Sequence, residues 1–85
     1  MIRFTGTLWR SGGKGGWTFV DVPDHAAPDA AGSWGRIPIR ATVDGHTWDT
    51  SLWRSKDGSV LLPVPKTVRG AKVAGDEVDV ELASR

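Results

Sequence analysis

The sequence contains no cysteine. A chain without cysteine has no disulfide framework, no thiolate metal site and no thiol nucleophile, so a small domain of this kind must be stabilised by packing or by oligomerisation. At 85 residues there is room for one hydrophobic core and one site. We therefore expect residues 1–85 to form a single small domain, and the absence of cysteine fits a cytoplasmic location.

A strong charge of one sign is also missing, because eleven Lys and Arg stand against ten Asp and Glu and the formal net charge is +1. This balance argues against a protein dedicated to binding the nucleic-acid backbone. The sequence has no run of about 18 apolar residues, which a membrane-spanning helix would need, and its N-terminal segment has no signal-peptide core. We expect a soluble protein of the cytoplasm that is neither exported nor bound to a membrane.

Histidine is scarce, and neither His25 nor His46 has a second ligand at the spacing of a metal site. A zinc or iron site would need an all-carboxylate ligand set that the sequence does not suggest. A nucleophilic triad of His46, Asp49 and Ser51 is excluded on a regular strand, because His46 points away from the face that the other two share. The sequence predicts no catalytic residue, no cofactor, no metal and no enzyme.

Apolar and polar residues alternate along most of the chain. In residues 2–8, for example, Ile2, Phe4 and Leu8 share one face, while Arg3 and Thr5 lie on the other. A period of two is typical of a half-buried β-strand. Strands are predicted over residues 2–8, 17–22, 35–43, 46–53, 60–64 and 77–83. This pattern predicts a mainly β fold, a small six-stranded barrel.

Turn signals separate these strands. Asp44-Gly45 is the strongest hairpin signal in the chain, and four glycines within residues 11–16 predict a hairpin loop. Residues 24–34 are rich in Ala, Pro, Asp and Gly and are assigned to a loop with one short helical turn. From Pro65 to Lys72 we predict a short helix that caps one end of the barrel, with the proline at its first helical position.

The outward positions of the last predicted strand are acidic. We expect them to pair across the sheet with Arg3 or with the row formed by Arg36 and Arg40. Exposed cross-strand ion pairs are common and stabilise a fold by only about 0.2–1 kcal/mol each. These charges are therefore interpreted as a solvated sheet face.

Seven short motifs occur in an order that resembles the bacterial and archaeal family known as domain of unknown function 1905. They are Phe4-Thr5-Gly6-Thr7-Leu8, Trp17-Thr18-Phe19-Val20 ending at Pro23, Gly35-Arg36-Ile37-Pro38-Ile39, Val43-Asp44-Gly45-His46-Thr47-Trp48, Leu61-Leu62-Pro63-Val64, the helix start from Lys66 to Arg69, and Gly75-Asp76-Glu77-Val78-Asp79-Val80-Glu81-Leu82. The resemblance implies a double-split β-barrel, related in shape to swapped-hairpin transcription factors and sometimes joined to a YdeI-like, bacteriocin-protection-type domain. It implies no catalytic residues.

Tryptophan is abundant, with five residues against two Phe and no Tyr. Trp9 and Trp53 fall on the polar faces of their strands, and each is followed by an arginine, Arg10 and Arg54. These pairs either cover a second small core beneath the loop of residues 24–34, form a dimer interface, or stack on a planar ligand. Core or loop-anchoring positions are expected for the remaining tryptophans, of which Trp34 is also kept as a ligand or interface candidate.

We predict a non-enzymatic binding module whose tryptophan-rich surface takes a small molecule, a peptide or another protein, either as a monomer or as a homodimer. The alternative is a DNA-binding homodimer resembling the swapped-hairpin transcription factors. Its basic edge would be formed by Arg36, Arg40, Arg54, Lys56, Lys66, Arg69 and Lys72. The near-neutral charge and the acidic last strand argue against that alternative.

Overall fold

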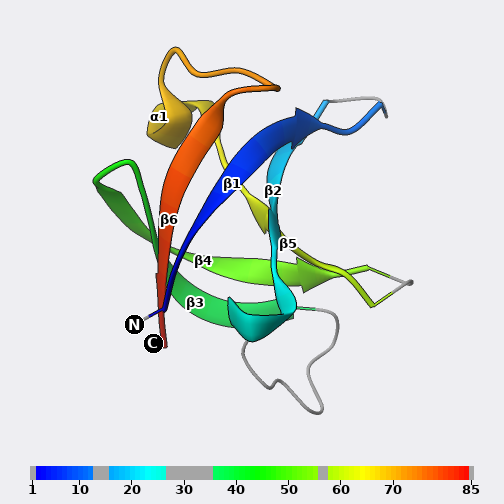
Figure 1. The fold of residues 1–85 in the computed structure, drawn as a ribbon, viewed down its shortest axis with the longest axis vertical. Helices are drawn as coiled ribbons and strands as arrows, with labels where there is room; N and C mark the ends of the chain where they lie inside the picture. Colours follow the sequence, from blue (N-terminus) through cyan, green and yellow to red (C-terminus); the bar gives the residue numbers. More distant parts are fainter. Residues whose placement is uncertain (1, 13–15, 27–35, 56–57, 85) are drawn as a thin grey trace.

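The computed structural model describes residues 2–12, 16–26, 36–55 and 58–84. Within them the chain forms a closed antiparallel barrel with the strand order β1-β2-β5-β4-β3-β6 (Figure 1). The elements are β1 (Ile2–Arg10), β2 (Thr18–Val22), the 3-10 turn η1 (Asp24–Ala26), β3 (Arg36–Val43), β4 (His46–Arg54), β5 (Val60–Pro63), α1 (Lys66–Arg69) and β6 (Glu77–Ala83). The predicted six-stranded barrel with a short helix after Pro65 is confirmed.

Several strands change neighbours along their length, as a double-split barrel requires. From Ile2 to Thr7, β1 pairs with β6, and only from Leu8 to Arg10 does it pair with β2. Strand β3 pairs with β4 throughout but with β6 only from Arg40 onward, and β4 meets β5 only at its last two residues. In Figure 1 the β3–β4 hairpin consequently lies across the long β1–β6 pair.

Proline 38 lies in the part of β3 that does not pair with β6. Proline has no N–H to contribute to a ladder, so it is tolerated where a strand lacks a neighbour on one side. Pro38 therefore occupies an edge position of β3.

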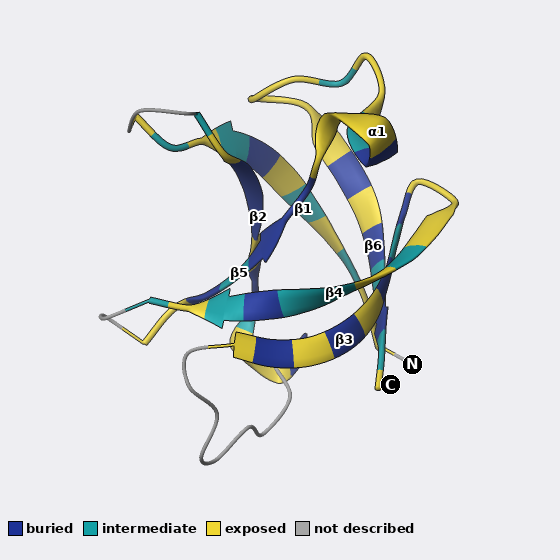
Figure 2. Ribbon diagram, turned by 180° about the vertical axis from the view of Figure 1, so that it is seen from behind, coloured by how far each residue is buried: buried dark blue, intermediate teal, exposed yellow. Residues whose placement is uncertain are grey.

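Side chains from alternate positions of the strands fill the interior of the barrel. Figure 2 shows this alternation as buried and exposed bands along β3 and β6. The fully buried side chains are aliphatic and of medium size: Leu8, Val20, Val43, Leu52, Leu62, Val64, Val78 and Val80. Phe4 and Trp48 pack against this core but are only partly buried. Trp48, expected in the core, therefore lies at its margin.

Helix α1 caps the barrel with Val68, whose side chain belongs to the core cluster. Pro65 is the N-cap residue and not the first helical residue, because its ψ of 159° is extended. Its carbonyl accepts hydrogen bonds from the N–H groups of Val68 and Arg69, at 2.9 and 3.0 Å. The proline thus stands one position earlier than predicted, and the helix itself forms where expected.

Gly6 lies in the part of β1 that is not paired with β2, and the core side chain of Val20 packs against its backbone. A Cβ atom at Gly6 would stand 2.3 Å from Cγ2 of Val20, and Val20 is fully buried. No real Cβ contact is so short, so a side chain at this position would force the core to shift. Gly6 is therefore required by packing.

The turn between β3 and β4 is fastened to β6 and to the segment after α1. Asp44 and Gly45 have φ values of 48° and 87°, as a tight hairpin turn demands. The N–H of Asp79 donates to Oδ1 of Asp44 at 2.9 Å, and Nζ of Lys72 lies 2.6 Å from its Oδ2. The hydrogen bond from Lys72 and that from the Asp79 backbone hold the pKa of Asp44 below its usual value, and Asp44 raises the pKa of Lys72.

Replacing Gly6 with alanine should lower the free energy of unfolding by roughly 1–3 kcal/mol, the usual cost of forcing an extra carbon into a packed core. The matched control is Gly12→Ala, because a Cβ atom there meets nothing within 4 Å. We expect the control to change stability by less than about 0.5 kcal/mol. Urea unfolding of the two variants measures both values, and equal losses would contradict the packing argument.

The Asp44→Asn variant should be less stable than the wild type at neutral pH, because the amide keeps an acceptor for Asp79 but loses the charge facing Lys72. A carboxyl whose pKa is lowered by folding stabilises the fold above its unfolded pKa of about 3.9. That contribution disappears as the pH falls through the lower folded pKa. The raised pKa of Lys72 acts oppositely, since its contribution is present below about 10.4 and is lost as the pH rises through the folded value.

The difference in melting temperature between wild type and Asp44→Asn should accordingly be largest between these two limits and should narrow on both sides. Thermal melts at a series of pH values measure it. A difference that stays constant from acid to neutral pH would show that the ion pair does not stabilise the fold.

Candidate functional site

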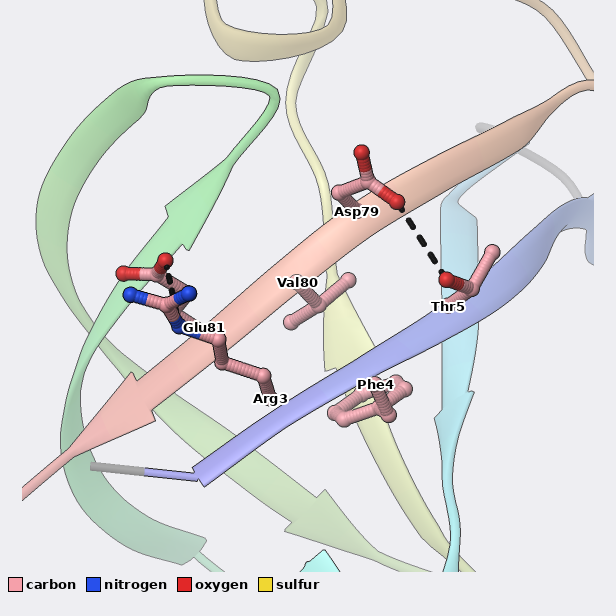
Figure 3. Close-up of a pocket in the computed structure, with 6 residues that line it drawn as sticks. All are labelled: Arg3, Phe4, Thr5, Asp79, Val80 and Glu81. Carbon is pink, nitrogen blue, oxygen red and sulfur yellow. Dashed lines mark hydrogen bonds and ion pairs between the residues drawn. The ribbon is translucent and has the colours of Figure 1, made fainter.

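The outer face of β1 and β6 carries a shallow hollow of about 420 Å³, in which the polar groups satisfy one another. Nε of Arg3 lies 2.9 Å from Oε1 of Glu81, and the hydroxyl of Thr5 donates to Asp79 at 3.2 Å (Figure 3). The pairing of the acidic last strand with Arg3 is thus confirmed. These groups are engaged in cross-strand contacts, which leaves little polar chemistry for a ligand.

The arginine row on β3 behaves differently from expectation. Arg40 pairs with Asp49 on β4, with Nε and Oδ1 2.9 Å apart, and not with the acidic row of β6. This hydrogen bond and the charge of Asp49 raise the pKa of Arg40. The reason is register, because Arg40 and Asp49 are directly opposite each other in the β3–β4 ladder.

An outer aromatic cluster, made of Trp9, Trp17, Phe19 and Trp53, covers the barrel where β1, β2, β5 and β4 follow one another. Phe19 is its centre, with ring centroids 5.1 Å from Trp9, 5.3 Å from Trp53 and 6.5 Å from Trp17. Phe19 is only 5% exposed, yet it lies outside the inner core cluster. The three indoles therefore bury it on the outer face, which makes a second small apolar cluster.

Strand register brings these rings together. Trp9 and Phe19 are directly opposite each other on β1 and β2, and Phe19 in turn faces Pro63 on β5. Trp53, on β4, pairs with Leu61 of the same β5 strand. Directly opposite side chains on one face of a sheet are close enough to pack.

The three indoles differ in how deeply they are buried and in the contacts that fix them. Trp9 is half-buried, and its ring N–H donates to Oδ1 of Asp21 at 2.9 Å. Trp53 is also half-buried, between Phe19 and Trp17. Trp17 is 54% exposed, although its ring centroid is only 5.2 Å from that of Trp53. Of the two positions expected for Trp17, core or loop-anchoring, the core is excluded, because Trp17 stands on the outward side just before β2.

The arginines that follow the tryptophans are not their partners. Successive residues on a strand point to opposite faces, so Arg10 and Arg54 leave the face that Trp9 and Trp53 occupy. The guanidinium of Arg10 lies against Gly16, where a Cβ atom would stand within 2.2 Å of it. The cation that does meet an indole is Arg36, which lies 5.2 Å from the ring centroid of Trp53.

A groove of about 340 Å³ lies beside the outer aromatic cluster, where β4 and β5 separate. We call it the β4–β5 groove. Its volume falls within the range of about 300–1,000 Å³ that is usual for small-molecule sites. It is lined by Trp17, Arg36, Trp48, Thr50, Ser51, Trp53, Pro63 and Pro65.

Two features of the chain open this groove. β5 ends at Pro63, and after Pro65 the chain enters α1, so within the described residues β4 has no paired strand on its β5 side before Trp53, although β3 pairs with it on the other side. Among the described residues that line the groove, Arg36 alone carries a charge. The groove therefore combines three indoles, two prolines and a single guanidinium.

The predicted site residues are thus divided by the structure. Trp9 and Trp53 share the outer aromatic cluster, Arg10 and Arg54 do not join it, and Trp34 lies outside the described residues. Sequence reasoning missed the role of Phe19 and of Arg36. The sequence held part of this information, because Phe19 is two positions from the outward Asp21 and therefore shares its face of β2. The pairing of Arg36 with Trp53, in contrast, could be seen only in the register of the β3–β4 ladder.

The part of the chain that the structure describes has neither a cluster of metal-ligating side chains nor a membrane-spanning helix. There, no three His, Cys, Asp or Glu side chains gather as they would around a metal ion. Nor does any helix in those ranges have the length and apolar character needed to cross a membrane.

Phe19→Ala should destabilise the barrel by roughly 3–5 kcal/mol, since it empties the centre of the outer aromatic cluster. Trp17→Ala, at the exposed margin of the same cluster, should cost less than about 1 kcal/mol. Urea unfolding measures both. If Phe19→Ala does not fold, Phe19→Leu provides the comparison with a smaller loss. Equal losses for Phe19 and Trp17 variants would contradict the assignment of Phe19 as the cluster centre.

Comparison with known proteins places the chain in a family. No curated protein matches it. A family model described as "Domain of unknown function (DUF1905)" matches residues 4–82. That span reaches from β1 to β6 and contains every described residue of the outer aromatic cluster and the β4–β5 groove. The chain therefore belongs to the DUF1905 family.

Proposed function

We propose that this domain is a non-enzymatic cytoplasmic binding module that holds a planar aromatic group in the β4–β5 groove. The observation that carries the proposal is Trp17. Its indole is 54% exposed and stands beside Trp53 at the edge of a groove of about 340 Å³. An indole that packs against a neighbouring ring and is otherwise open to solvent is suited to stacking on a planar ligand.

The exposure of Trp17 has a cost that a ligand would remove. Burial of apolar surface contributes about 25 cal/mol per Å², and aromatic pairs add about 0.5–1.5 kcal/mol beyond that area. Trp17 leaves more than half of its surface in water, whereas its neighbour Phe19 is buried and Trp53 is half-buried. A planar ring placed on Trp17 would gain both contributions.

The groove is also preorganised. Trp53 lies on a regular strand, with its ring centroid 5.3 Å from that of Phe19 and 5.2 Å from the guanidinium carbon of Arg36. Side chains fixed in this way lose little conformational freedom when a ligand binds. The position of the site on strands, and not on a long loop, supports a binding module of defined shape.

The contacts of the basic residues give no support to the DNA-binding alternative. A protein that binds the phosphate backbone needs cations free to replace counterions. Two residues of the proposed basic edge, Arg40 and Lys72, lie within 2.9 Å of a carboxylate oxygen of this chain, as does Arg3 outside that edge. The exposed feature that distinguishes the surface is aromatic.

Binding should be visible as shifts of the indole N–H signals of Trp17 and Trp53 in ¹H–¹⁵N spectra when a panel of planar bicyclic compounds of differing charge is added. Trp17→Ala should weaken binding of any responding compound by about tenfold, in line with the roughly 1–3 kcal/mol of one aromatic stacking contact. Trp9→Phe is the matched control, because Trp9 belongs to the outer aromatic cluster but does not line the groove.

A panel without any responding compound, or an unchanged affinity in Trp17→Ala, would overturn the proposal. Sedimentation at increasing protein concentration tests whether a second copy of the chain, and not a small ligand, occupies the groove. Dimerisation that Trp17→Ala abolishes would assign the exposed indole to a homodimer interface and not to a ligand.

A further inference from the structure

Two cross-strand pairs on the same outer face of the β3–β4 ladder differ in one respect. Arg40 stands opposite Asp49, and Arg36 stands opposite Trp53. The first arginine forms an ion pair at 2.9 Å, whereas the second lies over an indole ring at 5.2 Å. Where the register offers Arg40 a carboxylate, it offers Arg36 an aromatic face.

The charge of Arg36 is left without an opposite charge in the described part of the chain. No described carboxylate lies within 4.0 Å of its guanidinium, and the described residues that line the groove include neither Asp nor Glu. A guanidinium has five N–H donors, and an indole ring beneath it cannot satisfy them as a carboxylate would. Arg36 thus presents a planar donor to the groove.

This arrangement selects the charge of the ligand. Indole rings attract cations, and a groove lined by three tryptophans would ordinarily favour a cationic ligand. Arg36 already supplies the cation for Trp53 and would repel a second one. A carboxylate, in contrast, matches the fork of a guanidinium and accepts two parallel hydrogen bonds from it.

We propose that the ligand of the β4–β5 groove is a planar aromatic monocarboxylate, an inference that rests on the proposed function. Its ring stacks on Trp17, and its carboxylate accepts hydrogen bonds from Arg36. One guanidinium and no other charge in the described lining balance one negative charge. The site therefore discriminates by charge as well as by shape.

Three bicyclic probes with the same ring isolate the charge: 2-naphthoate, 2-naphthamide and 2-naphthamidine carry a negative, no and a positive charge at neutral pH. Isothermal titration should show naphthoate binding roughly ten- to a hundredfold more tightly than the amide, as expected for hydrogen bonds to a charged partner. The amidine should bind more weakly still. Because the contact is exposed, the preference should shrink as salt is added.

Arg36→Gln should reduce the affinity for naphthoate to that for the amide, and Arg36→Lys, which keeps the charge but loses the fork, should give an intermediate value. Arg40→Gln is the matched control, since it removes the other arginine of the same row without touching the groove. It should leave the preference for naphthoate unchanged. Circular dichroism confirms that each variant is folded.

The outcomes separate the two proposals. Equal binding of all three probes, with Trp17→Ala weakening each, would overturn the preference for a carboxylate and leave the binding module intact. A preference for naphthoate that survives Arg36→Gln, or that Arg40→Gln removes, would overturn the role of Arg36. Absence of binding by all three probes would remove the carboxylate inference, and the broader panel would then decide the fate of the binding module.

Discussion

The space inside the barrel is the constraint on which the rest of the structure depends. A closed barrel of this size is filled by side chains from alternate positions, and here these are Val, Leu, Ile and Ala. Such an interior has no room for an indole, so Trp48 and Phe4 lie at its margins and are only partly buried. Trp9, Trp17 and Trp53 must then lie outside, where they can bury Phe19 but cannot all be buried themselves.

Because β4 and β5 separate, the β4–β5 groove opens beside this second apolar cluster. A fully paired barrel would present its outer aromatic residues on a continuous convex sheet. Here pairing stops after two residue pairs, and Pro63 ends β5. The edge of β4, the start of α1 and the exposed face of Trp17 then enclose a groove. The same departure from regular pairing that lets α1 cap the core therefore also shapes the outer surface.

Local patterns were sufficient to predict the strands but not the contacts between them. Alternation identified five of the six strands, and a short apolar run ended by proline identified the sixth, over residues 60–64. Asp44-Gly45 identified a hairpin whose positive φ values the structure shows. Alternation also placed Trp9 and Trp53 outside. It should have separated them from Arg10 and Arg54, because neighbours on a strand point apart. The partner of Trp53 is Arg36, seventeen positions away, and only the register of the β3–β4 ladder brings the two together. The core remained among the positions expected for Trp17, because nothing in its own segment shows that the rings around it belong to the outer face.

The residues that stabilise the outer surface differ from those of the proposed binding site. Phe19 is buried and central, so the outer aromatic cluster depends on it. Trp17 and Arg36 are exposed and stand at its margin, where they contribute little to folding. A protein usually satisfies an outward arginine with an opposite charge, as this one does at Arg40. At Arg36 the opposite position holds the indole of Trp53 instead, with its centroid 5.2 Å from the guanidinium carbon, and no described carboxylate forms an ion pair with this arginine. A cation without an ion-pair partner among the described residues, beside an exposed aromatic face, adds little to the stability of a barrel, but it has the chemistry that the proposed recognition of a planar anion needs.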